Sequence, residues 1–250
     1  MTQSENGEVS QSDQGGAFRT TRWSLVMSAG DPSCPQATEA MEKLCRAYWY
    51  PLYAYLRKQG RNKESAEDLT QGLFARLLRL NSFGQVRPEK GRFRTFLLSS
   101  LKNFLSDQYD KERAIKRGGG CHFCSLDDSS AEERYQHEPA NVLDPEKLYE
   151  RRFALALLDQ ARQRLREEYA GRGKSALYEL LQTSDAGGPG TQTYKEIATR
   201  LGMTEQAVTS AAFAMRRRFS HLVREEVANT VESPADVDEE LRHLITVISG

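Results

Sequence analysis

The chain has 250 residues, of which 38% are hydrophobic and 28% charged, and its 35 basic and 35 acidic residues cancel. This composition favours small helical units over one deep core, and net charge by itself gives no sign of nucleic-acid binding. No apolar run approaches the ~18 residues that span a membrane, and the polar N-terminus has no signal-peptide core. The four cysteines show no disulfide-framework spacing. We therefore expect a cytoplasmic protein without membrane insertion.

The charge is segregated along the chain. Residues 87–117 contain nine Lys/Arg against four acids, about +5, and residues 127–150 contain eight acids against two basic residues, about −6. Such a separation predicts a polyanion-binding face beside an acidic linker.

Residues 1–17 contain Ser, Gln, Gly and acids with little that is apolar, which predicts a disordered N-terminus. The first helical domain is expected over residues 18–117. Apolar residues at helical spacing predict its helices over residues 36–60, 65–80 and 93–116. Pro51 lies inside the first of these helices and predicts a kink or a break.

The Gly-rich and then acidic residues 118–144 are the predicted linker. A helix-turn-helix domain is expected over residues 145–227, beginning with a long helix to about residue 169 and a short helix over residues 174–182. Residues 228–250 form an acidic C-terminal tail. Its short helix begins near Ser233 and places four apolar residues on one side, Leu241, Leu244, Ile245 and Ile248.

Two helices joined by a tight turn end the second domain. Thr193 and Glu196 form a capping box, and Gly202 permits the left-handed turn that ends the first helix. Thr204 caps a longer second helix. This pattern predicts a helix-turn-helix, with a generic helical hairpin as the alternative. Three adjacent arginines at residues 216–218 favour the helix-turn-helix, because they suit phosphate contacts.

These motifs together resemble the extracytoplasmic-function (ECF) group of bacterial RNA polymerase sigma factors. The resemblance rests on AEDLTQGLFARLL (residues 66–78), GRFRTFLLSSLKNFLSDQYDKERAIKRGG (residues 91–119) and the helix-turn-helix. The phrases TTRWSLV, YWYPLYAYLR and KRGGG look like the larger ECF proteins of planctomycete-type bacteria. The resemblance implies an all-α fold of two small domains joined by a flexible acidic linker. It also implies a transcription initiation factor that binds core RNA polymerase and promoter DNA, with an anti-sigma factor as a further partner.

The resemblance assigns three sets of residues by position. In the family, the helix matching residues 66–78 docks on the polymerase clamp helices, and the matching positions are Asp68, Gln71 and Phe74. The set implied for binding and melting the −10 element is Arg87, Lys90, Arg92, Arg94, Lys102, Asn103, Arg113, Lys116 and Arg117. The set implied for the −35 element is Thr204, Glu205, Gln206, Thr209 and Ser210, with Arg216 and Arg217 on phosphate.

Three features leave alternatives open. Single strands also bind to aromatic faces, but Phe96, Phe104 and Tyr109 are interpreted as core residues in preference to stacking surfaces. Many ECF recognition helices are basic where this chain has Thr209 and Ala211, so weaker −35 recognition is expected. The alternative function is therefore a sigma-fold protein that binds polymerase or a regulator without reading promoters.

Other chemistry is weakly supported. Cys121 and Cys124 have the spacing of a zinc or redox pair, but zinc needs two more ligands and the chain has no second cysteine pair. We find no phosphate-binding loop and no nucleophile elbow, and expect no catalytic site, metal or cofactor.

The acidic segments suggest regulation within the chain. One hypothesis is that the linker and the tail, from Val231 onward, cover basic DNA-binding surface when polymerase is absent. The alternative is that the tail helix only packs its apolar residues on the second domain and stabilises it.

Overall fold

The computed structural model describes residues 35–79, 92–114, 130–138, 144–186, 192–231 and 233–249. The regular elements of these residues are all helical, which confirms the expected all-α class. They are α2 (Pro35–Lys58), α3 (Lys63–Arg79), α4 (Phe93–Ala114), α5 (Ala131–Gln136), α6 (Pro145–Gly171), α7 (Ser175–Ala186), α8 (Tyr194–Leu201), α9 (Glu205–Ala228), the 3₁₀ turn η2 (Pro234–Asp236) and α10 (Val237–Ser249). The predicted disordered N-terminus, Cys121 and Cys124 lie outside the described residues.

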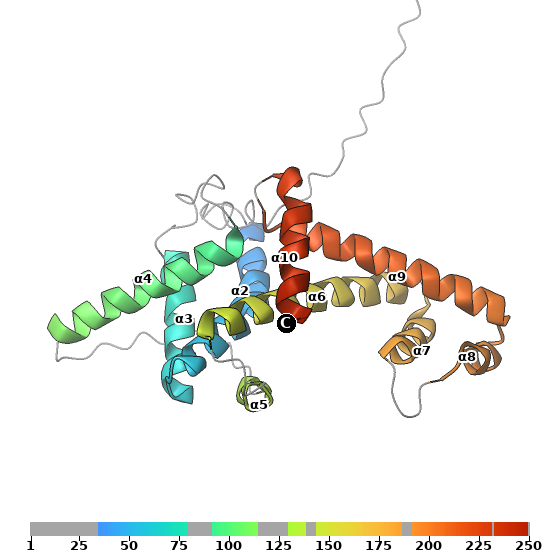
Figure 1. Ribbon diagram of the computed structural model, residues 1–250, viewed down its shortest axis with the longest axis horizontal. Helices are drawn as coiled ribbons and strands as arrows, with labels where there is room; N and C mark the ends of the chain where they lie inside the picture. Colours follow the sequence, from blue (N-terminus) through green and yellow to red (C-terminus); the bar gives the residue numbers. More distant parts are fainter. Residues whose placement is uncertain are drawn as a thin grey trace, which may run out of the picture.

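The molecule is elongated (Figure 1), with α2 to α5 gathered at one end and α7 and α8 at the other. The long helices α6 and α9 run between the two ends, and α10 crosses α6 near the middle. This arrangement separates the predicted −10 region, on α4, from the predicted helix-turn-helix, α8 and α9.

Local caps explain where several helices begin. The Asn62 side chain accepts a hydrogen bond from Ser65 N at 2.9 Å at the start of α3, and Asp144 accepts one from Glu146 N at 2.9 Å at the start of α6. Of the expected kink or break at Pro51, the break is wrong because α2 continues through this residue, and the kink stays a prediction. Buried residues on both sides of Pro51, from Tyr48 to Leu56, hold the helix together despite one lost backbone hydrogen bond.

The described residues form two hydrophobic clusters, and both α6 and α9 contribute residues to each of them. Phe153 and Leu157 of α6 pack in the first cluster with α2, α3 and α4, whereas Leu165 and Tyr169 pack in the second with α7, α8 and the N-terminal part of α9. Val227, at the end of α9, returns to the first cluster. The two clusters are therefore joined by continuous helices. Most of the predicted linker, residues 118–144, lies outside the described residues.

Ion pairs hold α6 and α9 together where they run side by side. Arg164 of α6 donates to Glu225 and Glu226 of α9, both at 2.7 Å. One turn further on, Glu168 accepts two hydrogen bonds from Arg218. As the residue number rises along α6, the number of its partner in α9 falls. The two helices are therefore antiparallel.

Helix α5 lies within the predicted linker and was not expected from the sequence. Its surroundings are aromatic and charged: Tyr50 of α2 donates to Glu138 at 2.7 Å, and the Arg134 guanidinium lies 3.8 Å from the centre of the Tyr50 ring. Burial, and then the hydrogen bond to Glu138, raise the pKa of Tyr50. Glu132 accepts from Tyr53 and from Arg57. Acids of this segment thus attach it to α2.

The C-terminal tail packs on the first cluster. Leu244 is buried there, and Leu241 and Ile248 are partly buried against it, as the apolar spacing predicted. The placement of Ile245 on the same side is wrong, since 61% of Ile245 is exposed. Val237 at the start of α10 is buried in its stead. The buried side of α10 is therefore narrower than its sequence predicted.

Candidate nucleic-acid interface

The predicted −10 set is only partly described by the structure. Arg92, Arg94, Lys102 and Asn103 lie on or beside α4. The other members fall outside the described residues or have undescribed side chains: Arg87, Lys90, Arg113, Lys116 and Arg117.

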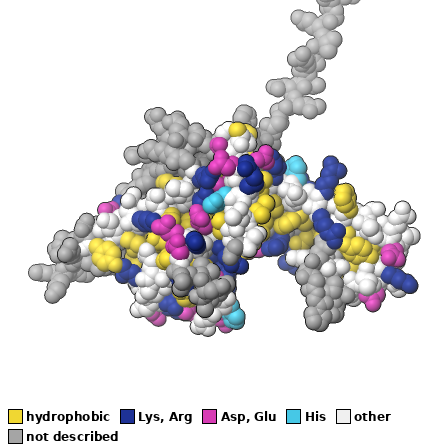
Figure 2. Space-filling model, viewed as in Figure 1, with side chains coloured by type: hydrophobic (Ala, Val, Ile, Leu, Met, Phe, Trp, Pro, Cys, Tyr) yellow, Lys and Arg dark blue, Asp and Glu magenta, His cyan; other side chains and the backbone are white. Residues whose placement is uncertain are grey.

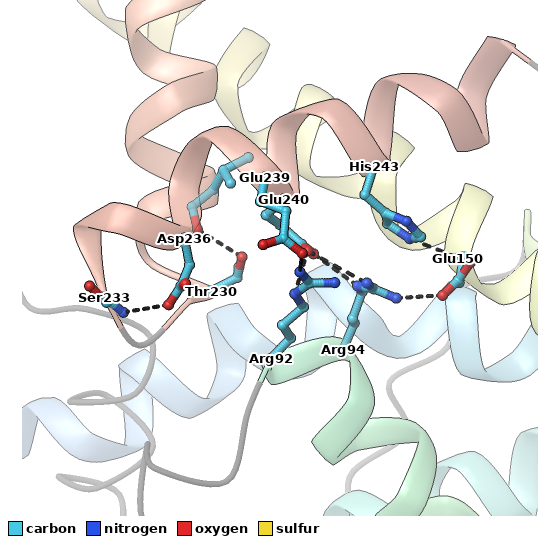
Figure 3. Close-up of polar contacts among 10 residues, drawn as sticks. Arg92, Arg94, Glu150, Thr230, Ser233, Asp236, Glu239, Glu240 and His243 are labelled. Carbon is cyan, nitrogen blue, oxygen red and sulfur yellow. Dashed lines mark hydrogen bonds and ion pairs between the residues drawn. The ribbon is translucent and has the colours of Figure 1, made fainter.

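Arg94 is buried, with 7% of its surface exposed. Its Nε donates to Glu240 of α10 at 2.8 Å, and its Nη1 donates to Glu150 of α6. The Tyr149 hydroxyl donates to the Arg94 carbonyl oxygen at 2.8 Å, and burial raises the pKa of Tyr149. In this conformation Arg94 lies between three helices and is not open to DNA (Figure 3).

Arg92 immediately precedes α4 and is bound by the same tail helix. It contacts Glu239 at 2.5 Å and Glu240 at 3.0 Å, and 30% of its side chain is exposed. Between the two arginines, Phe93 N donates to the Thr230 carbonyl oxygen at 3.0 Å. This bond satisfies one of the backbone donors that the start of a helix leaves free. The junction of α9 with the tail thus caps α4.

Lys102 and Asn103 are exposed on α4. Lys102 contacts Glu146 at the start of α6 at 2.5 Å, and this hydrogen bond raises the pKa of Lys102. About half of each of the two side chains is exposed, 47% for Lys102 and 56% for Glu146, so solvent weakens the pair. Lys102 can exchange this partner for a phosphate more easily than Arg94 can.

The three aromatic residues of α4 do not share one environment. Phe104 is buried and Phe96 is partly buried, as interpreted from the sequence. Tyr109 was expected in the core, and this is wrong because 51% of it is exposed. The Arg61 guanidinium lies 5.2 Å from the centre of the Tyr109 ring. Together they form an exposed aromatic surface beside a positive charge.

The predicted polymerase-binding residues differ in exposure. Asp68 is exposed and Gln71 is partly exposed on α3. Phe74 is only 4% exposed and packs in the first cluster with its neighbour Leu73. In this conformation Phe74 therefore lies beneath the α3 surface that carries Asp68 and Gln71.

Helices α8 and α9 have the caps and the turn that their sequence predicts. The Thr193 hydroxyl accepts from Glu196 N at 3.3 Å, and Glu196 accepts from Thr193 N at 2.7 Å, so the capping box is complete. The backbone N–H of Thr193 and then its hydroxyl, which also donates to the Glu196 carboxylate at 3.0 Å, lower the pKa of Glu196. Gly202 has φ 65°, and the Thr204 hydroxyl accepts from Ala207 N at 3.2 Å. Both ends of the turn are fixed.

The first turns of α9 expose the predicted reading residues, Glu205, Gln206, Thr209 and Ser210. Thr204, which caps the helix, is exposed as well. Val208 and Ala212 are fully buried against the second cluster and fix the rotation of the helix. The exposed stripe continues at Phe213, 67% exposed. Sequence reasoning missed Phe213, although its spacing of four from Thr209 puts it on the same face.

The three adjacent arginines of α9 have different surroundings. Arg216 donates to the Tyr194 hydroxyl at 2.6 Å and so ties α9 to α8. Arg217 is exposed. Arg218 turns inward to Glu168 of α6, and this pairing lowers the pKa of Glu168. Of the run, Arg218 is the one that joins α9 to α6.

The described residues contain neither a metal cluster nor a membrane-spanning helix. Within these, no group of three or more His, Cys, Asp or Glu side chains is arranged to hold a metal ion. In the same part of the chain, no helix has both the length and the apolar character needed to cross a membrane.

Residues 44–115 match the family model of sigma-70 region 2. The match spans most of α2, all of α3 and all of α4. No curated protein and no solved structure matches the chain. Region 2 of sigma factors binds core RNA polymerase and promoter DNA during transcription initiation. Residues 44–115 are therefore similar to region 2 of the sigma-70 family.

Proposed function

We propose that the chain is an ECF-type sigma factor that joins core RNA polymerase and directs it to a specific promoter set. Its first domain contacts the −10 element and its helix-turn-helix contacts the −35 element. The observation that carries the proposal is the region 2 match over residues 44–115. A capped helix-turn-helix at the opposite end of the molecule supports it (Figure 1).

The polymerase contact is proposed on the outer side of α3. Asp68 and Gln71 offer polar groups there, and Phe74, buried in the first cluster, supports the helix from beneath. A charged side chain on an exposed helix can contribute to docking without disturbing the core of its own protein.

The −10 contact is proposed along α4 and the residues on either side of it, with Arg87, Lys90, Arg92, Arg94, Lys102, Asn103, Arg113, Lys116 and Arg117 as contacts. Basic groups follow a phosphate backbone, and aromatic faces accept unstacked bases. Tyr109, exposed beside Arg61, is the aromatic surface that the structure adds to this set.

The −35 contact is proposed for the exposed stripe of α9. Residues at the start of a recognition helix reach base edges in the major groove, which suits Gln206, Thr209 and Ser210, with Thr204 and Glu205 at the helix start. Phe213 continues the stripe and can contact a thymine methyl group. Arg216 and Arg217 follow as proposed phosphate contacts.

Run-off transcription with bacterial core polymerase on a pooled library of random promoters tests this function. Discrete start sites that share two upstream elements are the expected result. A matched chain carrying Asp68→Ala and Gln71→Ala should lose transcripts together with polymerase binding in a pull-down. Absence of both transcripts and polymerase binding in the unaltered chain would contradict the proposal.

A second function is favoured by two particular observations. Arg92 and Arg94 are paired with acids of the chain itself, and the recognition helix has no basic group at Thr209 or Ala211. Both features fit a sigma-fold protein that binds polymerase or a regulator without reading promoters. Polymerase binding in the pull-down, with no transcripts from the library, would favour this function.

A further inference from the structure

Helix α10 of the tail lies on the part of α4 that the proposed function assigns to the −10 strand. Glu239 and Glu240 contact Arg92, and Glu240 also binds Arg94 (Figure 3). Phe93 N is bonded to the Thr230 carbonyl oxygen between them. We call the contact of Thr230, Glu239 and Glu240 with residues 92–94 the tail latch.

The charges at the tail latch show what it does to the arginines. With α10 in place, Arg92 and Arg94 face three carboxylates, those of Glu150, Glu239 and Glu240, so this set has a net charge of about −1. Without the tail, only Glu150 remains and the set becomes about +1. Figure 2 shows acidic and basic side chains intermingled over α10. The latch thus changes the sign of the charge offered to a polyanion.

A phosphate and a carboxylate compete for the same groups. Both bind a guanidinium through oxygens that accept its forked N–H donors, and Glu240 already accepts from Arg94 Nε and contacts Arg92. Burial of Glu240, which is 1% exposed, leaves no space for a nucleotide beside it. Occupation of residues 92–94 by α10 and by DNA is therefore mutually exclusive.

The packing of α10 allows it to leave. α10 follows α9 and η2 in chain order, so its release breaks none of the helices α2 to α9. One side of α10 carries exposed residues, including Asp238, Glu239 and Ile245. A helix that packs on its neighbours through one side can open locally at lower free energy than the core.

We propose that α10 is a displaceable acidic cap, which holds Arg92 and Arg94 at the N-terminal end of α4 and must release them before single-stranded DNA contacts these two arginines. The inference rests on the proposed function. In the open form of the chain, α10 has left Arg92 and Arg94. If DNA binds only this open form, DNA binding must in turn favour release of α10.

The first measurement is the affinity of the intact chain for a fluorescein-labelled single-stranded DNA of random sequence, by anisotropy at low salt. Glu239→Gln with Glu240→Gln keeps the shape of both side chains and removes their charge. We expect DNA binding at least about threefold tighter than in the unaltered chain, because a larger fraction is open. Thermal unfolding of the variant shows that it is folded.

Asp238→Asn is the matched control. It removes one negative charge from the adjacent position of α10, but Asp238 pairs with Arg224 of α9 and not with α4. The affinity of this variant should stay near that of the unaltered chain. If Asp238→Asn tightened DNA binding as much as the double variant does, the cap would be overturned. The gain in affinity would then come from the overall charge of the tail and not from the contacts with Arg92 and Arg94.

Hydrogen exchange of the unaltered chain gives a second readout that needs no variant. Amides of residues 237–249 should exchange faster when the same DNA is bound. DNA binding with unchanged exchange in α10, and no tightening by the double variant, would overturn the cap while leaving the proposed function intact. Failure of every form to bind DNA would also overturn the cap, whereas the proposed function is decided separately by the transcription and polymerase-binding assays.

Discussion

Arg94 and Arg92 are neighbours in sequence that differ in burial, and this difference predicts unequal effects on stability. Arg94→Ala leaves Glu240 buried without its closest cation, so the free energy of unfolding should fall by about 3–5 kcal/mol. Arg92→Ala, at a position where 30% of the side chain is exposed, should cost about 0.2–1 kcal/mol. Urea denaturation compares the two variants. Equal losses would contradict the buried role of Arg94.

This difference also decides which variants can test DNA contacts. Loss of transcription in Arg94→Ala would follow from unfolding as readily as from a lost phosphate contact. Arg92 and Lys102, whose side chains are partly exposed, are the described residues better suited to that test.

A second residue-scale prediction concerns pH. Arg218 holds the pKa of Glu168 below its ordinary value near 4.5. The pair therefore stabilises the fold fully above that value, and its contribution is lost as the pH falls through the lowered pKa. Glu168→Gln should lower the free energy of unfolding by about 0.5–1 kcal/mol at pH 7. The difference between the two chains should shrink as the pH falls below 4.5 and through the lowered pKa of Glu168; a difference independent of pH would contradict the assignment.

Among the single helices, α8 depends on the capping box at its N-terminus. Thr193→Ala removes the acceptor for Glu196 N and should lower the free energy of unfolding by about 1 kcal/mol. Thr199→Ala is the control, since Thr199 is exposed on the same helix and bonds only within it. Its effect should stay within about 0.5 kcal/mol. Chemical denaturation of both variants measures the contrast, and similar losses would argue against the capping box.

Helix α9 carries the prediction for Phe213. Because Phe213 is 67% exposed, Phe213→Ala should change the free energy of unfolding by less than about 0.5 kcal/mol. If its ring contacts a thymine methyl, binding to a duplex selected from the promoter library should weaken by at least about 1 kcal/mol. Ser220→Ala, exposed further along α9, should alter neither quantity. Unchanged affinity in Phe213→Ala would remove it from the reading face.

Because α6 and α9 belong to both hydrophobic clusters, the whole molecule should unfold as one cooperative unit. Leu181→Ala, in the second cluster, should destabilise the chain by about 2–5 kcal/mol. In a Trp23→Phe background, fluorescence reports only on Trp49, which is buried in the first cluster. In Leu181→Ala, the unfolding midpoint measured by Trp49 fluorescence should fall together with the midpoint measured by circular dichroism. A Trp49 midpoint unchanged by the substitution would show that the two clusters unfold independently.

The sequence by itself determined where most helices begin. Asp144, Thr193, Gly202 and Thr204 act through hydrogen bonds and backbone angles within a few residues, so each could be predicted without knowledge of the fold. Residue spacing likewise predicted the exposed residues at the start of α9. It predicted the apolar face of α10 only in part, because Ile245 is exposed.

Only the tertiary structure decided which charged residues are available. Arg94 and Glu240 are 146 residues apart in the chain, and nothing in the local sequence of α4 indicates that one guanidinium is buried and its neighbour partly exposed. The attachment of α5 to the aromatic residues of α2 has the same origin, with Tyr53 and Glu132 separated by 79 residues. Contacts of such range depend on how the helices pack together, because burial and pairing are set by neighbours in space.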